Sequence, residues 1–261
     1  MINYSFSMYE LEFYLLVLIR VTCFIFVAPF FSMTNTPARV KITIGVFLSY
    51  LIYHSLYPHE QIVYETVLEY AVIVLKEALT GLIIGLAAGI CNSIIVFAGR
   101  MIDMEIGLAM ASMYDPTTRE MSSVSGVLYQ YLVLMILVMT DMHHYLIKAL
   151  VETFTLIPVN GAIFHSDLML ETIIMFLGDY INVGFRICLP VFCAMLITNC
   201  VLGIMAKVAP QMNMFAVGIQ IKLLMGLVVM FLTVGMLPYI SDFIFTEMKT
   251  MIVSFVEALM A

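Results

Sequence analysis

The residues of this chain best suited to chemistry gather in one short stretch. Asp141, His143 and His144 are followed closely by Lys148 and Glu152. Residues three apart share a helix face, so a helix here would bring Asp141 and His144 together. Imidazole and carboxylate groups bind zinc, but the sequence supplies no third and fourth ligand at a fixed spacing. We therefore predict no metal site and interpret the stretch as a helix end at a membrane boundary.

No other pattern in the sequence indicates catalysis. The G-x-S-x-G, P-loop and H-E-x-x-H motifs are all absent from the sequence, and no pair of carboxylates marks a cleft. The five cysteines form no C-x-x-C motif and lie in apolar stretches, where cysteine usually packs as a small hydrophobe. We expect neither an enzyme nor a bound cofactor.

The composition excludes an ordinary soluble domain. Of 261 residues, 63% are hydrophobic and only 11% are charged, and the mean hydropathy is +1.08. A soluble protein of this size has about twice that share of charged residues. The net charge of −7 also argues against a nucleic-acid partner, which would require a basic surface. The sequence therefore predicts an all-α, hydrophobic multi-helix protein, embedded in a membrane or an assembly, without a soluble domain.

Long apolar blocks define the elements that must position any site, and they form one domain over residues 1–261. Most are long enough to cross a membrane, which takes about 20 residues. The blocks are 11–31, 42–57, 67–98, 127–138, 168–206 and 216–245. Block 168–206 is too long for one perpendicular span, and Pro190 favours a division into two helices because proline cannot donate its backbone hydrogen bond.

Several charged residues lie well inside these blocks, and we single out Arg20, Lys76, Glu77, Arg186 and Lys222. Each would be costly if it faced lipid alone, so each should face protein or water. Internal ion pairs or snorkelling stems explain such residues as well as a transport path does. The sequence leaves the two interpretations open.

Gly81, Gly85 and Gly89 recur at intervals of four residues and share one helix face. Such a face allows the backbone of a second helix to approach closely. We interpret these glycines as a packing surface, and a neighbouring subunit is a candidate partner.

A polar stretch over residues 107–121 separates two apolar blocks. The sequence Asp115-Pro116 marks a turn within it. Its candidate functional residues are Gly107, Met110, Met113, Tyr114, Asp115 and Pro116. Non-helical backbone at membrane depth is tolerated only where protein or a cavity surrounds it. The stretch is therefore either a loop outside the membrane or a plug inside a pore.

Residues 207–213 read as the tip of a helical hairpin. Lys207 suits a helix C-terminus, Pro210 interrupts the helix, and Asn213 can cap the helix that follows. Together with Phe215 and Gly218, Pro210 and Asn213 form a second predicted contact with neighbouring subunits.

The order of several motifs resembles the FliR family of flagellar export-gate proteins. Segment 209–213, followed by Phe215 and Gly218, carries this resemblance most clearly. The other matching features, in chain order, are Arg20, Pro29, Pro37, Arg39, Lys41, residues 107–116, His143, residues 150–154, Pro158, Leu189-Pro190 and Thr198-Asn199. The resemblance covers nearly the whole chain.

The resemblance implies a non-enzymatic subunit of the flagellar type III export gate. FliR-like proteins assemble, one per complex, with FliP-like and FliQ-like subunits into a closed helical pore, and a FlhB-like protein associates with it. The pore lies in the bacterial inner membrane, within the flagellar basal body, and passes unfolded flagellar proteins. A proton gradient and a separate ATPase supply the energy, so the subunit itself needs no cofactor.

The resemblance also identifies residues 107–121 as the plug of the pore. Bulky, often aromatic side chains are expected where this chain has Met110 and Met113, and methionine can fill such gaps. Gly107 and Gly126 would allow movement. Because the family places much of its assembly above the bilayer plane, apolar helices can be buried against sister subunits as well as in lipid.

Two alternatives remain at this point. A virulence-type injectisome counterpart would share the fold, and gene neighbours would distinguish it. A small-solute transporter would instead use Arg20, Lys76 and Arg186 as a binding site and show saturable uptake as a single protein.

Overall fold

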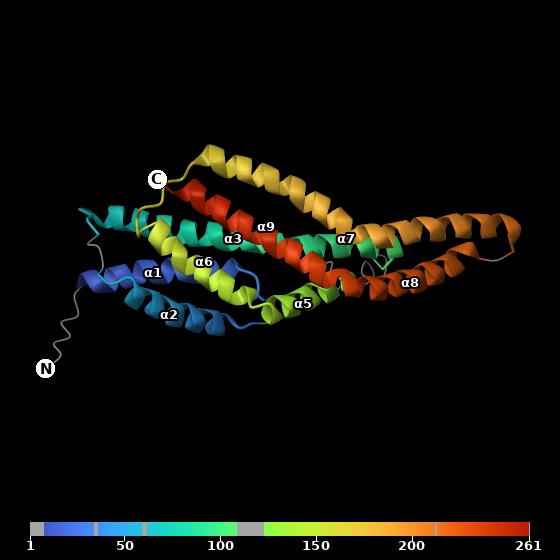
Figure 1. Cartoon of the computed structure of the whole chain (residues 1–261), viewed down its shortest axis with the longest axis horizontal. Helices are drawn as coiled ribbons and strands as arrows, with labels where there is room; N and C mark the ends of the chain where they lie inside the picture. The colour runs from blue at the N-terminus through green and yellow to red at the C-terminus, as the bar shows by residue number, and fades with distance from the viewer. Residues whose placement is uncertain (1–7, 34–35, 59–61, 109–122, 212, 261) are drawn as a thin grey trace. The chain divides into compact units, whose positions relative to one another are not determined.

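The computed structural model describes residues 8–33, 36–58, 62–108, 123–211 and 213–260. Every regular element in these ranges is helical. Figure 1 shows the chain order by colour, and the residues divide into two compact units that we describe in turn.

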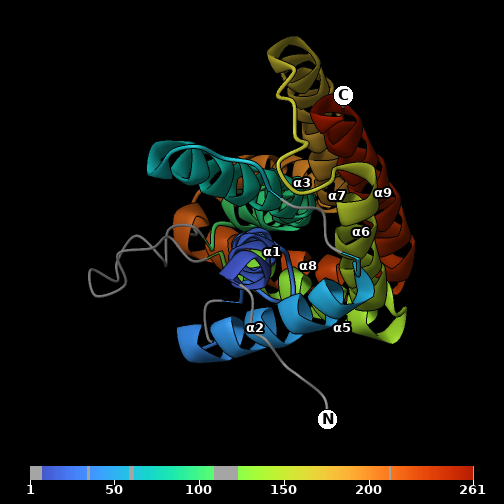
Figure 2. The ribbon, with the colours of Figure 1, turned by 90° about the vertical axis from the view of Figure 1, so that its left-hand side faces the viewer.

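The first unit combines residues 1–91, 141–175 and 246–261. Its elements are α1 (Met8–Val27), α2 (Ala38–Ser55), the beginning of α3 (Val67–Ile106), α6 (Met142–Leu156), the beginning of α7 (Ser166–Val208) and the end of α9 (Leu237–Leu259). Helices α1 and α2 pack against each other; α2 returns in roughly the opposite direction in Figure 1, and Figure 2 shows that it crosses α1 obliquely. One stripe of α1, with Leu16, Val17, Val21 and Phe24, is buried at helical spacing.

The glycine face of α3 packs directly on the backbone of α1. A Cβ atom on Gly81 would overlap the carbonyl oxygen of Arg20, and one on Gly85 would lie 2.9 Å from the carbonyl oxygen of Phe24. A Cβ atom on Gly89 would lie 3.1 Å from the carbonyl oxygen of Val27. The close approach that the spacing predicts is therefore made by a helix of the same chain. A contact between these glycines and another subunit stays a prediction.

The second unit combines residues 92–140 and 176–245. It contains the end of α3, α5 (Val124–Met139), the longer part of α7, α8 (Met214–Thr233), the short 3₁₀ turn η1 (Val234–Met236) and the beginning of α9. Helices α7 and α8 form the hairpin drawn in orange in Figure 1. In the interior of the unit, the Tyr129 hydroxyl on α5 bonds the Thr233 hydroxyl on α8 at 2.9 Å.

The predicted break at Leu189-Pro190 is wrong, because α7 continues through Pro190 from Ser166 to Val208. Proline removes a single hydrogen bond from a helix, the one to the carbonyl four residues earlier. Apolar helices tolerate this loss where neighbouring elements support them. Buried residues on both sides of Pro190, such as Ile187 and Val191, provide that support.

Three helical segments in the described ranges are long and apolar enough to cross a membrane: Val67–Ile106, Ser166–Val208 and Phe215–Leu259. The number rises to four if α5 and α6 together form one broken span. Blocks 11–31 and 42–57, which form α1 and α2, are not among these segments, so the expectation that most of the six apolar blocks could cross holds for at most four of them. The protein is a hydrophobic, all-α membrane protein. The single functional domain over residues 1–261 stays a prediction.

Candidate functional site

The polar stretch after α3 begins with a well-defined helix end. Gly107 adopts φ +92°, a left-handed conformation that glycine accepts without steric cost. Its N–H donates to the carbonyl oxygen of Asp103 at 3.0 Å, as is common where a helix stops at glycine. The predicted plug residues Met110, Met113, Tyr114, Asp115 and Pro116 lie outside the described residues.

A buried carboxylate joins the two ends of this stretch. Asp103, near the end of α3, is only 5% exposed. Its carboxylate accepts hydrogen bonds from the Ser123 hydroxyl at 2.7 Å, from the Ser125 N–H at 3.2 Å and from the Ser125 hydroxyl. Ser123 in turn accepts the N–H of Gly126 at 2.9 Å and so caps α5. These residues, which we name the loop-base cluster, tie residue 103 to residues 123–126.

Close backbone packing holds the same point. A Cβ atom on Gly99 of α3 would overlap the backbone of Gly126 on α5. The loop-base cluster therefore lies beside a tight crossing of two helices. This packing favours a fixed contact at Gly126 over the point of movement that the sequence analysis expects there. A Cβ atom on Gly107 would meet no other atom within 4 Å, so close packing does not argue against movement at Gly107.

The sequence analysis missed the loop-base cluster. Asp103 lies just beyond the apolar block that ends at residue 98, and serines beside a turn are common. The available signal was a carboxylate in the last turn of a long apolar helix, because such a group must find donors when it is buried.

The hairpin between α7 and α8 has the tip that the sequence predicts. Lys207 lies in the last turn of α7, where its charge meets the negative end of the helix dipole. Asn213 caps α8 by accepting the Ala216 N–H at 3.4 Å, which confirms its predicted role as a cap. Gly218 is buried against Leu202 on the facing helix. Phe215 is 71% exposed, and Pro210 is also exposed, so this tip presents an apolar surface.

Among the five charged residues that the sequence analysis singles out, Arg20 and Glu77 are completely buried and paired. The guanidinium of Arg20 donates from Nε to Glu77 Oε2 at 2.6 Å and from Nη2 to Oε1 at 2.9 Å. This bidentate geometry is the strongest arrangement of the two groups. The interpretation of Arg20 and Glu77 as an internal ion pair is therefore confirmed.

Arg20 also closes the C-terminal end of α6. Its Nη1 donates to the carbonyl oxygen of Ile157 at 2.9 Å, and Nη2 lies 3.4 Å from that of Pro158. The ring of Phe154 packs on the guanidinium at 4.4 Å. Cations near a helix C-terminus bond its last carbonyl groups and offset its dipole. Arg20 on α1 thus connects α3, α6 and the segment that follows α6.

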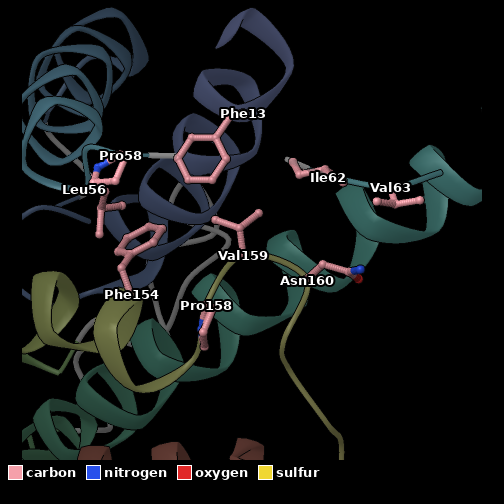
Figure 3. A pocket seen from close by; sticks show the side chains of 9 residues that line it. All are labelled: Phe13, Leu56, Pro58, Ile62, Val63, Phe154, Pro158, Val159 and Asn160. Carbon is pink, nitrogen blue, oxygen red and sulfur yellow. The ribbon is translucent and has the colours of Figure 1, made fainter. Parts of the chain in front are cut away.

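A pocket of about 420 Å³ borders this buried cluster. Figure 3 shows it between Phe13 of α1, Leu56 after α2, Phe154 of α6 and Val159. None of its nine lining residues is titratable, and Asn160 supplies the single polar side chain. The Asn160 N–H is already bonded to Glu77 Oε1 at 2.9 Å. Among the described residues that line it, the pocket has no acid, base or nucleophile for catalysis.

The other three charged residues lie in more open positions. Lys76 and Lys222 are half-buried, and Arg186 is exposed. No ion pair joins any of the three to another residue of the described ranges. Their predicted burial is thus incomplete within the chain.

The Asp141, His143 and His144 cluster is compact but open to solvent. One possible ligand atom from each residue lies within 4.8 Å of the others. Asp141 and His144 form an exposed contact at 3.3 Å between carboxylate and imidazole. His143 Nδ1 is buried and has no hydrogen-bond partner within the described part of the chain. The exposed pair at the start of α6 agrees with its interpretation as a helix end, and the absence of a metal stays a prediction.

Comparison with known proteins identifies the family to which this chain belongs. A family model described as "Bacterial export proteins, family 1" matches residues 11–248. The chain belongs to this family. Its similarity to flagellar biosynthetic protein FliR extends over most of both chains. The Bacillus subtilis protein is 27% identical over 219 residues, which cover 83% of this chain and 84% of the relative.

Two further relatives extend the same result to distant bacteria. Flagellar biosynthetic protein FliR of Escherichia coli is 24% identical over 249 residues, covering 95% of this chain and 94% of the relative. The Aquifex aeolicus protein is 29% identical over 230 residues, covering 86% and 88% respectively. This member of the export family is a membrane-embedded component of the flagellar export apparatus. It is a transport subunit and not a known enzyme.

Proposed function

We propose that this subunit forms, with FliP-like and FliQ-like subunits, the closed pore through which unfolded flagellar proteins are exported. One copy enters each pore, a FlhB-like protein associates with it, and the complex lies in the bacterial inner membrane within the flagellar basal body. The stretch 107–121 is the plug, and its apolar side chains close the pore by steric occlusion. Family membership supports this assignment.

The loop-base cluster is the observation that carries the proposal. A plug must keep ions and water from passing through the pore, so both of its ends must be held firmly by the pore wall. Asp103 bonds Ser123 and Ser125, and Gly99 packs on Gly126, immediately beside the stretch. A loop that merely connects two helices outside the membrane needs neither a buried carboxylate nor a helix crossing at its base.

The apolar surface of α8 supports assembly with other subunits. Phe215, Phe231 and Leu232 are 71%, 80% and 69% exposed. Continuous apolar surface of this kind requires cover from lipid or from protein. The hairpin tip at Pro210 and Asn213 would provide a contact at one end of this surface.

Deletion of residues 111–121 tests the plug. We expect the complex to assemble normally and the resting membrane to leak ions, measured as conductance in planar bilayers that contain the purified complex. A Gly-Ser segment of the same length is the matched control, because it keeps the connection and removes the apolar side chains. It should leak as well. Unchanged conductance in both variants would refute the plug.

Purification of the tagged chain from native membranes in mild detergent tests the partners. FliP-like and FliQ-like subunits should be recovered with the wild type, and Pro210→Leu should reduce their recovery. A chain recovered alone would refute the proposed pore. The transporter alternative gains no support, since Arg20 is bonded to Glu77 and to main-chain carbonyls and has no donor left for a solute.

A further inference from the structure

A second pocket, of about 200 Å³, lies in the second unit beside the proline of α7. Its walls include Arg186 and Pro190 of α7, Thr233 and Met236 near the end of α8, and Tyr239 and Phe243 of α9. Pockets for soluble cofactors or drug-sized ligands are larger, at about 300–1,000 Å³. This pocket therefore suits a small polar group that continues into an apolar portion.

Among the described residues that line this pocket, Arg186 supplies the only cationic group. The side chain is exposed, and it makes no hydrogen bond or ion pair with another residue of the ranges that the structure describes. An arginine without an anion is costly in apolar surroundings. Lys222 on α8 poses a smaller problem, because it is half-buried and its flexible stem can move the ammonium toward water.

The position of Arg186 along α7 indicates where its anion lies. Twenty residues without any charge, from Ile187 to Ala206, separate Arg186 from Lys207. A helix of this length spans about 30 Å, which is the thickness of the hydrocarbon core of a bilayer. Cations placed at both ends of such a segment lie at the level of the lipid headgroups. The pocket therefore opens where phosphate groups are most concentrated.

The remaining lining complements a phospholipid. Because Pro190 has no N–H, the carbonyl oxygen of Arg186 lacks its usual helical donor and can accept a hydrogen bond from a headgroup hydroxyl. Tyr239 is 77% exposed, and tyrosine is enriched at membrane interfaces. Exposed apolar residues on the same face of α7, such as Ile197, Val201 and Ile204, continue from the pocket along the uncharged segment, where an acyl chain would lie.

We propose that this pocket binds the headgroup of an anionic phospholipid, with its phosphate on the guanidinium of Arg186 and an acyl chain along α7. The structure favours a lipid over a carboxylate of a partner protein because the cation stands at the end of a bilayer-length apolar segment. The proposal does not depend on the pore or its plug. Asp242, the acidic residue next to Phe243 on α9, has interactions of its own.

Lipid binding by the purified full-length chain, or by its complex, tests the proposal. The protein is incubated in detergent with equal amounts of phosphatidylglycerol and phosphatidylcholine, and the retained lipids are counted by native mass spectrometry. Wild type should retain phosphatidylglycerol preferentially. Arg186→Ala should retain about fivefold less of it, as expected for the loss of one interfacial cation. Arg186→Lys should keep most of the preference.

Three controls separate the explanations. Lys249→Ala removes an exposed cation of α9 that does not line the pocket, and it should leave lipid retention unchanged. Met236→Trp should reduce retention by filling the pocket while Arg186 keeps its charge. Millimolar inorganic phosphate should not displace the lipid, because the acyl chain contributes to binding.

Equal retention of phosphatidylglycerol by wild type and Arg186→Ala would overturn the proposal. Displacement by inorganic phosphate alone would also overturn it, since the site would then recognise free phosphate. A loss of partner subunits from Arg186→Ala with unchanged lipid retention would assign Arg186 to a protein carboxylate and refute lipid binding.

Discussion

Replacement of Glu77 by leucine should destabilise the first unit severely. The carboxylate accepts hydrogen bonds from Arg20 Nε, Arg20 Nη2 and the Asn160 N–H, and both charged side chains have no solvent exposure. Glu77→Leu keeps a comparable volume but leaves the guanidinium buried without an anion. Removal of one partner from a buried pair costs about 3–5 kcal/mol. Contacts of Arg20 with Ile157 and Pro158 persist, so they moderate the loss but do not neutralise the charge.

Thiol labelling measures this change, because the chain has no tryptophan for fluorescence. Cys91 is fully buried in the first unit and reacts only after local or global opening. Exposed Cys193 and Cys200 are replaced by serine beforehand, so that they do not react first. A loss of 3 kcal/mol corresponds to a labelling rate of Cys91 roughly a hundredfold faster than in the wild type.

Two further variants show whether charge burial is the cause. Glu152→Gln breaks an exposed pair with Lys148 at 3.7 Å, and it should cost at most about 0.5 kcal/mol. The double variant Arg20→Met with Glu77→Leu should be more stable than Glu77→Leu alone, because it leaves no unpaired buried charge. A labelling rate in Glu77→Leu within twofold of the wild type would refute this account of the cluster.

Four other substitutions, one of them a control, test the remaining contacts. Gly81→Ala should speed thiol labelling of Cys91, because its Cβ would overlap an α1 carbonyl oxygen. Gly178→Ala, which has open space around it, should instead stabilise α7 by about 0.5–1 kcal/mol. Asp103→Ala should cost about 2–4 kcal/mol of stability, since two buried serines lose their acceptor. Labelling of buried Cys188 in the second unit measures this loss, and an unchanged labelling rate would contradict the role of Asp103. Asn213→Ala should cost about 0.5 kcal/mol, and an unchanged thermal midpoint by circular dichroism would show that the cap contributes nothing.

Local features of this fold could be predicted well from the sequence. The glycine spacing in α3, the cap at Asn213 and the helix end near Lys207 depend on residues within a few positions of each other. Local sequence controls helix ends and close helix faces, because the groups concerned belong to one or two turns. These predictions therefore needed no knowledge of the tertiary structure.

Features that depend on distant residues were missed or left open. Arg20 meets a carboxylate 57 positions away and carbonyl groups more than 130 positions away, and no spacing rule links them. Asp103 gains its role only when α5 returns to α3. The uninterrupted course of α7 depends on packing around Pro190, which compensates for the missing hydrogen bond. Tertiary contacts decided each of these cases.

The contacts of Arg20 also constrain how this region can diverge between species. On α6 and the segment after it, Arg20 donates only to main-chain oxygens, those of residues 153, 157 and 158. A carbonyl group is the same whichever side chain its residue carries. Glu77 is the one acceptor that meets the guanidinium with a side chain. Mutation can therefore alter Ile157 without removing the interaction, whereas Arg20 and Glu77 are expected to persist or to be replaced together. A compensated double replacement, rather than gradual drift, is the route by which a lineage would lose this ion pair.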